Sequence, residues 1–254
     1  MRGEQHGGRV ISGELTEAYE VLPSVEAPIV LSCEHATNRL PPGWTWPLKD
    51  AWLVETHWAF DLGIADVTRE LATALRAPAV LSRFSRLLID PNRDTASPTL
   101  FRDVADGRLV QLNRGLPWHE RQRRLTELYM PFHQAFGRLA EAAPGADLLS
   151  LHSFTPVYEG GPPRPMEIGI LFDREDVLAR ALANHLSDVG WVVALNKPYS
   201  GQGGNMYSVD HHAMANQRRA IELELRQDVT TDPARRERLV TDLAEALRVT
   251  GMAR

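Results

Sequence analysis

The sequence predicts an α/β protein: a three-layer α/β/α sandwich built on a mostly parallel, mixed sheet. Two observations lead to this fold class. Short apolar runs of strand length alternate along the chain with longer segments whose apolar residues recur at helical spacing. Such alternation is typical of a parallel sheet covered by helices on both faces. No repeat, linker or shift in composition divides the 254 residues, so we expect a single domain over 1–254.

The first half of the chain supplies a regular series of elements. An apolar run predicts a strand at 30–33. The helical spacing of Leu62, Ala65, Leu71 and Leu75 predicts a helix at 61–76. Two further short apolar runs predict strands at 79–81 and 87–89.

The second half continues the alternation. A long helix is expected at 118–142, bent at Pro131 because proline lacks a backbone donor. Strands are expected at 147–151, 168–172, 191–195 and 221–225, and helices at 176–189 and 234–249. The segments 155–167 and 196–205 are too rich in proline and glycine to be regular elements. They are either lids over a binding site or plain surface loops.

Composition restricts the class of protein. The chain is 43% hydrophobic and 24% charged, and its net charge of -5 gives no reason to expect nucleic acid or an anionic membrane as a partner. No apolar run approaches the roughly 18 residues that span a bilayer. Residues 1–9 are polar and lack a secretory signal, so the expected location is the cytoplasm. The single cysteine, Cys33, excludes an intrachain disulfide and is expected in the core.

Polar side chains stand at or just after the ends of several expected strands. Because the carboxyl ends of parallel strands lie along one edge of a sheet, we expect these side chains to converge on a site. A single histidine at a strand end is usually a capped or solvated residue, but here four strand ends carry such groups. They are His35, Asp90, Asn92, Arg93, His152, Glu224 and Arg226.

Two histidines and a carboxylate at such an edge predict a catalytic zinc site, which typically has three protein ligands and an open position. His35 and His152 can supply the two imidazoles. Glu34 is a poor third ligand, because neighbouring residues on a strand point to opposite faces. Asp61 is better placed. It lies four residues after His57, so one of these two could bind the metal while the other supports it.

The last expected strand carries the acid–base candidates. Glu222, Glu224 and Arg226 occupy alternate positions and therefore share one face. This face could hold a general base and an anion clamp together. The alternative is an edge strand with one solvated face.

At this point the chain resembles the N-formylglutamate amidohydrolase family. The resemblance rests on a set of motifs in the expected order that covers nearly the whole chain. The motifs are S-C-E-H-A-T-N-R-L-P at 32–41, H-W-A-F-D-L-G at 57–63, R-F-S-R-L-L-I-D-P-N-R at 83–93, L-Y-M-P-F-H at 128–133, S-L-H-S-F-T-P-V at 150–157, R-P-M-E-I-G-I-L-F at 164–172, N-K-P-Y-S-G at 196–201 and E-L-R-Q-D-V at 224–229.

The resemblance implies a fold related to zinc-dependent exopeptidases and hydrolysis of a small N-acyl amino acid, with N-formyl-L-glutamate as the leading candidate. E-L-R at 224–226 is similar to the catalytic E-L-R of metallocarboxypeptidases, which implies Glu224 as general base and then acid. Their H-x-x-E metal motif is replaced here by H-A-T-N at 35–38. Asp61 is therefore expected to complete the zinc site with His35 and His152.

Substrate contacts are expected from arginines, whose planar guanidinium can bind both oxygens of a carboxylate. Arg86 or Arg93 would stabilise the developing oxyanion or hold a substrate carboxylate. Further candidates for substrate contacts are Asn92, Arg164, Tyr199 and Arg226. His212 lies in an H-H-A segment that the family shares, and the sequence gives it no role.

Two other functions compete with an N-acyl amino acid hydrolase. The first is a zinc peptidase or cell-wall amidase, which needs a long open groove; the two Pro/Gly-rich segments favour closure over a small ligand instead. The second is a non-catalytic carboxylate-binding protein on a hydrolase fold, which the presence of Glu224 and both ligand histidines disfavours. A monomer and a homo-oligomer are equally compatible with the sequence.

Overall fold

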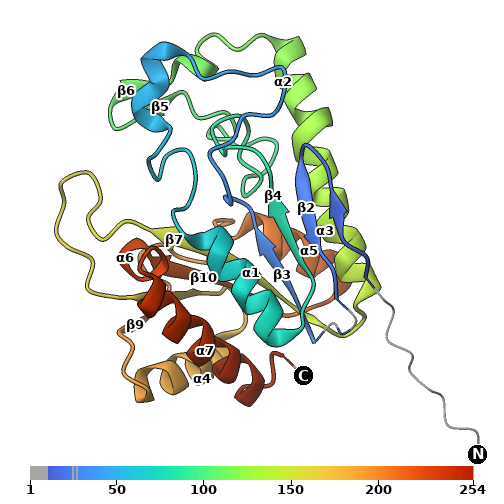
Figure 1. Cartoon of the computed structure of the whole chain (residues 1–254), viewed down its shortest axis with the longest axis vertical. Helices are drawn as coiled ribbons and strands as arrows, with labels where there is room; N and C mark the ends of the chain where they lie inside the picture. Colours follow the sequence, from blue (N-terminus) through green and yellow to red (C-terminus); the bar gives the residue numbers. More distant parts are fainter. Residues whose placement is uncertain (1–10, 25, 27, 254) are drawn as a thin grey trace, which may run out of the picture.

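The computed structural model describes residues 11–24, 26 and 28–253 (Figure 1). The N-terminal segment 1–9, in which no secretory signal is expected, lies outside the described residues. Eight strands form one sheet in the order β1-β2-β4-β3-β7-β10-β8-β9. These strands are β1 (Glu14–Leu15), β2 (Tyr19–Leu22), β3 (Ile29–Cys33), β4 (Ala79–Ser82), β7 (Asp147–Phe154), β8 (Ile168–Leu171), β9 (Val193–Leu195) and β10 (Ala220–Arg226).

The centre of the sheet is parallel and its flanks are mixed. β4, β3, β7 and β10 run in the same direction, whereas β2 pairs antiparallel with β4 and β8 pairs antiparallel with β10. Two short strands, β5 (Val104–Ala105) and β6 (Arg108–Leu109), form a separate hairpin. The predicted mostly parallel, mixed sheet is confirmed.

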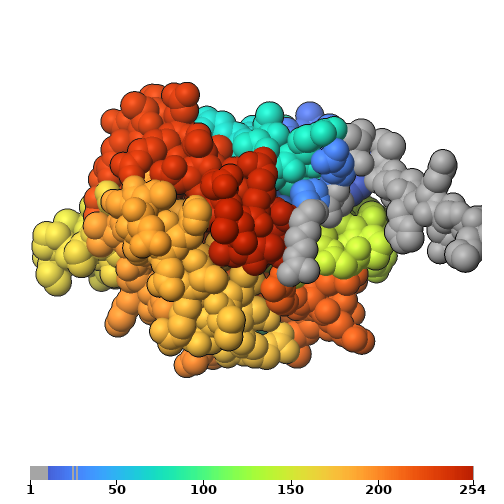
Figure 2. Space-filling model, turned by 90° about the horizontal axis from the view of Figure 1, so that it is seen from below, coloured from blue at the N-terminus to red at the C-terminus, as the bar shows by residue number. Residues whose placement is uncertain are grey.

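Helices cover both faces of the sheet, as predicted. One face packs against α1 (Ile64–Leu75), α4 (Asp176–Asp188) and α7 (Pro233–Val249), and the other against α3 (Met130–Ala142) and α5 (Tyr207–Asn216). Figure 2 shows α4 and α7 next to each other on the lower side of the molecule. The short helix α6 (Gln227–Thr230) joins β10 to α7. None of the helices in the described part of the chain is long and apolar enough to cross a membrane.

One face of the central strands changes from apolar to polar along its length. In β7 and β10, Leu148 and Ala220 pack into the core beneath α3 and α5. Further along the same face, toward the carboxyl ends, His152 and Glu224 lie opposite each other in register. The strands therefore contribute to the core at one end and carry functional groups at the other.

The apolar run at 87–89 is buried, but it is not a strand, so this prediction was wrong. The amide of Leu87 donates to the Ser85 hydroxyl, and the amide of Leu88 donates to the Ser85 carbonyl, which folds the run into a turn. Its side chains still fill two apolar clusters. A short buried run cannot be assigned to strand or turn from its apolarity alone.

The long helix predicted at 118–142 is interrupted. It consists of α2 (Trp118–Arg124), a π-helical turn (Leu125–Tyr129) and α3, with Pro131 in the first turn of α3. The residues before it keep helical backbone angles, so Pro131 lies inside a continuous helical run, where its missing donor interrupts the regular hydrogen bonds. The sequence did not predict β1, β2, the β5–β6 hairpin, α5, or the 3₁₀ helices at Leu48–Leu53 and Gln111–Asn113.

Candidate active site

Three buried side chains converge at the carboxyl edge of the sheet. His35 lies in the turn after β3, Asp61 lies in the loop before α1, and His152 lies near the end of β7. His35 Nδ1 is 3.4 Å from Asp61 Oδ2. His152 Nδ1 is 3.0 Å from both Asp61 Oδ2 and His35 Nδ1. The exposed fractions of the three residues are only 2%, 3% and 3%.

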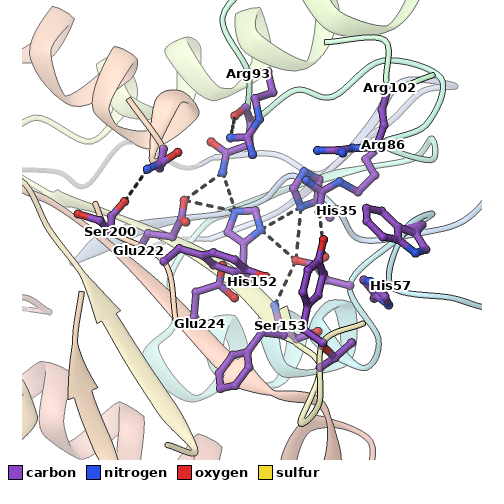
Figure 3. Close-up of a pocket in the computed structure, with 18 residues that line it drawn as sticks. His35, His57, Arg86, Arg93, Arg102, His152, Ser153, Ser200, Glu222 and Glu224 are labelled. Atoms are coloured by element: carbon purple, nitrogen blue, oxygen red, sulfur yellow. Dashed lines mark hydrogen bonds and ion pairs between the residues drawn. The ribbon is translucent and has the colours of Figure 1, made fainter. Parts of the chain in front are cut away.

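The other ring nitrogen of each histidine faces a carboxylate. His35 Nε2 lies 2.7 Å from Asp90 Oδ1, and His152 Nε2 lies 3.2 Å from Glu34 Oε2 (Figure 3 shows the two rings). A neutral imidazole donates from only one nitrogen, so this network assigns the protons to Nε2. The Nδ1 lone pairs then point toward each other and toward Asp61. Metal-ligating histidines are typically oriented by such carboxylate contacts.

This cluster fits a divalent metal. Two nitrogen lone pairs and a carboxylate oxygen at these separations repel each other unless a cation lies between them. A tetrahedral zinc ion with bonds of about 2.0–2.1 Å would hold its ligands about 3.3 Å apart, close to the separations seen. Although burial opposes it, Glu222 and Asp61 raise the pKa of His152 well above its ordinary value, so the cluster attracts positive charge. It is the one candidate metal-binding group found in the described residues.

The loop that carries Asp61 is held closely to the sheet. Asp61 Oδ2 accepts a hydrogen bond from the Ser153 amide at 3.1 Å, and the Asp61 amide donates to the His35 carbonyl at 3.0 Å. Gly63 follows with φ 75°, and a Cβ there would lie 2.6 Å from the Thr230 carbonyl oxygen. Only glycine adopts this positive φ easily and leaves the space beside Thr230 free, so Gly63 permits the turn that places Asp61 next to the two histidines.

The structure groups Asp61, rather than His57, with the two histidines. The expected helix at 61–76 begins at Ile64, so His57 and Asp61 do not share a helical face. His57 instead lines the cavity, and its buried Nε2 has no hydrogen-bond partner among the described residues.

Glu34 follows β3 and is completely buried. Its Oε2 accepts a hydrogen bond from the Ser150 hydroxyl at 2.7 Å and faces the outer nitrogen of His152. Although burial opposes it, these contacts lower the pKa of Glu34 to about 2. Glu34 therefore supports a candidate ligand and does not belong to the converging group. It is not separated from His35 across a strand, because both residues lie in the turn after β3 and both contact the His152 ring.

A cavity of about 370 Å³ opens beside the cluster (Figure 3). Its size suits a small molecule better than a polymer. It is lined by His35, His57, Trp58, Asp61, Arg86, Asn92, Arg93, Arg102, His152, Ser153, Phe154, Thr155, Tyr158, Tyr199, Ser200, Asn205, Glu222 and Glu224.

Two glutamates of β10 face this cavity from the same side of the sheet. Asn92 Nδ2 donates to Glu222 Oε2 at 3.1 Å, so Glu222 is engaged. Glu224 is 6% exposed, and its Oε2 has no hydrogen-bond partner among the described residues. Burial, reinforced by the charges of Glu222 and Asp61, raises the pKa of Glu224 well above its ordinary value. Glu224 thus has a free carboxylate oxygen in the cavity wall.

Arg86 lies between two of the site's carboxylates. Its Nη2 is 2.8 Å from Asp90 Oδ2, and its Nη1 is 3.5 Å from Asp61 Oδ1. Although burial opposes it, these two charges raise the pKa of Arg86 above its usual value, so the guanidinium stays charged. Arg86 is therefore a fixed positive charge beside the candidate metal ligands.

Not all expected substrate contacts line the cavity. Asn92, Arg93 and Tyr199 do. Arg164 does not; its guanidinium lies 5.1 Å and 5.4 Å from the ring centres of Tyr158 and Tyr199 and braces these rings. Arg226 is also absent from the wall, because its guanidinium binds Asp228 and backbone carbonyls of 164–166.

Several residues of the site were not expected from the sequence. Arg102, Trp58 and Tyr158 line the cavity. They lie in irregular segments, where no periodicity shows which side chains point inward. His212 now has a contact: its Nε2 lies 3.1 Å from His133 Nδ1, and His133 Nε2 lies 3.1 Å from the Pro91 carbonyl oxygen in the turn beside Asp90.

The sandwich and its buried cluster define an α/β protein with a candidate metal centre at the carboxyl edge of the sheet. The family model for N-formylglutamate amidohydrolase matches residues 27–231. The chain therefore belongs to the N-formylglutamate amidohydrolase family, which confirms the resemblance seen in its motifs and makes it an amidohydrolase. A search of curated proteins found no match.

Solved structures share the fold. A gene product from Agrobacterium tumefaciens is 28% identical, with a TM-score of 0.81 over 92% of this chain and 95% of that chain. N-formylglutamate amidohydrolase from Ralstonia eutropha JMP134 is 21% identical, with a TM-score of 0.67 over 94% of this chain and 98% of that chain. The fold thus extends over nearly the whole length of both relatives.

Proposed function

We propose that this protein hydrolyses the amide bond of a small N-acyl amino acid, and that N-formyl-L-glutamate is its substrate, giving formate and L-glutamate. The observation that carries the proposal is the position of Glu224. Its unpartnered carboxylate oxygen lines the same small cavity as the His35–Asp61–His152 cluster. The match to the N-formylglutamate amidohydrolase model supports the choice of substrate.

His35, Asp61 and His152 would hold one divalent metal, zinc, through Nδ1, Oδ2 and Nδ1. When bound, the ion supplies Lewis-acid chemistry, polarising a carbonyl and making water a better nucleophile near neutral pH. Asp90 and Glu34 keep the two imidazoles oriented with their lone pairs inward.

Glu224 acts as general base and then as general acid. Its carboxylate takes a proton from the attacking water while the water oxygen forms a bond to the acyl carbon. It then returns this proton to the amide nitrogen as the carbon–nitrogen bond breaks, so the products are a carboxylic acid and a free amine. The cavity around Glu224 limits competing contacts with bulk water.

Arg86 stabilises negative charge that develops on the acyl oxygen. Its guanidinium is held by Asp90 and Asp61 and needs no rearrangement during the reaction. A fixed charge of this kind lowers the barrier because it is already oriented when the oxyanion forms.

The experiment is a turnover panel of N-formyl and N-acetyl amino acids with zinc-loaded protein and Glu224→Gln protein. We expect release of formate from N-formyl-L-glutamate by the wild type and little release by the variant. A peptidase or cell-wall amidase would instead cleave peptides or muropeptides and leave the panel intact. A non-catalytic protein would bind panel members without turnover.

A further inference from the structure

Arg102 is a cation in the cavity wall without an acidic partner. It precedes the β5–β6 hairpin and is half-buried. No carboxylate forms an ion pair with its guanidinium in the part of the chain that the structure describes. Its charged group lies 5.4 Å from the ring centre of Trp58. Arg86, by contrast, has both Asp90 and Asp61 within reach.

The surroundings make this charge costly unless a ligand neutralises it. Burial, followed by repulsion from Arg86 and Arg93, lowers the pKa of Arg102 from its usual value. Desolvated charges in proteins are normally paired. The missing partner is therefore an anion that enters the cavity.

Arg93 is the second cation of this kind. Its guanidinium donates to the Asn92 carbonyl at 3.0 Å and has no carboxylate partner among the described residues. In the view of Figure 3, Arg86 and Arg102 lie to the right of His152, Arg93 lies above it, and Glu222 and Glu224 lie to its left. The cavity thus offers two unpaired cations to a ligand.

The two cations occupy different parts of the wall. Arg93 directly follows Asn92, whose side chain lies 3.3 Å from His152 Nε2, and the Arg93 guanidinium binds the Asn92 carbonyl. Arg102 instead lies over the Trp58 ring, and the rings of Trp58 and Tyr158, which both line the cavity, lie 6.0 Å apart. An N-acyl amino acid carries its α-carboxylate beside the scissile amide and any side-chain carboxylate further away.

We propose that Arg102 is the specificity-determining residue that binds the side-chain carboxylate of a dicarboxylic N-acyl amino acid, while Arg93 binds the α-carboxylate. This inference rests on the proposed hydrolysis of N-acyl amino acids. The inference adds the residue that distinguishes a substrate with a side-chain carboxylate from a substrate with the uncharged amide in its place. The planar guanidinium can bind both carboxylate oxygens at once, whereas an amide offers only one acceptor.

The test compares N-formyl-L-glutamate with N-formyl-L-glutamine in zinc-loaded wild type, Arg102→Gln and Arg102→Lys. A hydrogen bond to a charged group corresponds to a discrimination of roughly 10- to 100-fold. We expect the ratio of kcat/KM for the two substrates to favour glutamate in the wild type. The ratio should fall by about that factor in Arg102→Gln and by less in Arg102→Lys. Arg108→Gln is the matched control, because Arg108 is exposed on β6 and packs on Trp52 outside the cavity.

The outcomes separate this inference from the proposed function. If Arg102→Gln loses activity equally on both substrates, or keeps the wild-type ratio, the role of Arg102 is refuted while the hydrolase proposal stands. If the wild type hydrolyses neither substrate, the proposed function fails, and calorimetric binding of glutarate and butyrate decides the role of Arg102. Tighter binding of glutarate that Arg102→Gln abolishes supports the anion site, and equal binding of both acids overturns it. If Arg102→Gln does not fold, the kcat/KM ratio of Arg102→Lys is compared with that of the wild type. A reduced preference for glutamate in Arg102→Lys supports the role of Arg102, and an unchanged preference refutes it.

Discussion

His35 donates a hydrogen bond from Nε2 to Asp90 Oδ1 over 2.7 Å, while its Nδ1 faces Asp61. Asp90 also accepts hydrogen bonds from the Arg86 guanidinium and from the backbone amide of Asn92, so both oxygens of its carboxylate are held in place. The imidazole of His35 is therefore oriented before any ligand arrives. Asp90 acts on the cluster without belonging to it.

This relationship predicts that Asp90→Asn weakens metal binding. Loss of the carboxylate removes the acceptor that fixes the tautomer and orientation of the His35 ring, and such changes typically cost 10- to 100-fold in metal affinity. Competition with a chromogenic zinc chelator measures the affinity directly. Asp94→Asn is the control, because Asp94 is exposed in the same loop. Equal zinc affinity in Asp90→Asn and wild type would show that His35 is not held in this way.

The ligand assignment predicts a stronger loss when an imidazole is removed. His35→Ala and His152→Ala should each purify with far less zinc than the roughly one ion per chain expected of the wild type, because two ligands bind zinc weakly. Elemental analysis of protein purified without chelator gives the stoichiometry. His57→Ala is the control, because His57 lines the cavity but lies outside the converging group. Full zinc content in both ligand variants would place the metal elsewhere.

Glu224→Gln should abolish most turnover and leave zinc content and fold intact. Glutamine keeps the size of the side chain but cannot accept the proton, and positioned acid–base catalysis contributes roughly 10²- to 10⁴-fold. Steady-state kinetics with the preferred substrate of the panel measures the loss, and zinc analysis of the same samples shows that the site is loaded.

Glu222→Gln is the matched comparison, since both glutamates line the cavity from β10. Glu222 is already engaged by Asn92, so its replacement should reduce turnover less than Glu224→Gln does. A larger loss of turnover in Glu222→Gln than in Glu224→Gln would show that Glu222, and not Glu224, is the general base.

Much of the site could be predicted because strand ends are visible in the sequence. The runs before His35 and His152 are apolar enough to be recognised as strands, and parallel strands share their carboxyl edge. Period-two alternation likewise put Glu222 and Glu224 on one face. Arg226 follows the same period but lies at the last position of β10, where Asp228 binds it, so alternation alone could not place it in the cavity.

The remainder depends on irregular segments. Arg102 and Tyr158 reach the cavity from loops, whose path follows from tertiary contacts and not from periodicity. The helix α5 was missed because Tyr207–Asn216 has no clear apolar stripe. The prediction for the run at 87–89 was wrong for a related reason: its side chains are buried in two apolar clusters while its backbone forms a turn, and burial alone does not specify strand geometry.

The packing around β8 predicts that Gly169→Ala is destabilising. A Cβ at Gly169 would lie 2.0 Å from the Lys197 carbonyl oxygen and 3.2 Å from Glu224 Cβ, so the backbone must shift. We expect a loss of about 2 kcal/mol or more in the free energy of unfolding, measured with urea. Gly137→Ala in α3 is the control. There the nearest atom is a His212 ring carbon at 3.6 Å, and alanine is the better helix former by about 1 kcal/mol. Equal stability of Gly169→Ala and wild type would mean that β8 and 196–198 are not packed this closely.

The last prediction concerns the pH dependence of stability through Asp210 on α5. Burial, followed by the charges of Glu222, Asp173 and Glu175, raises the pKa of Asp210 from 3.8 to about 7. A raised pKa means that the fold favours the neutral acid. The stabilisation from the neutral acid is complete below about pH 4 and is lost as the pH rises through about 7. Asp210→Asn is neutral at every pH, so its stability relative to the wild type should increase over that interval and then level off.

Urea unfolding of wild type and variant at about pH 4 and about pH 8 measures this change, and the comparison cancels titrations that the two proteins share. Because Asp210 is partly exposed, solvent screening makes the effect smaller than the pKa shift alone implies. Asp188→Asn on α4 is the control, because Asp188 is exposed and its substitution removes a carboxylate from a helix without changing α5. A constant difference between Asp210→Asn and wild type would show that Glu222 and its acidic neighbours do not act on Asp210, and that the surroundings of Asp210 on α5 are more hydrated than their packing indicates.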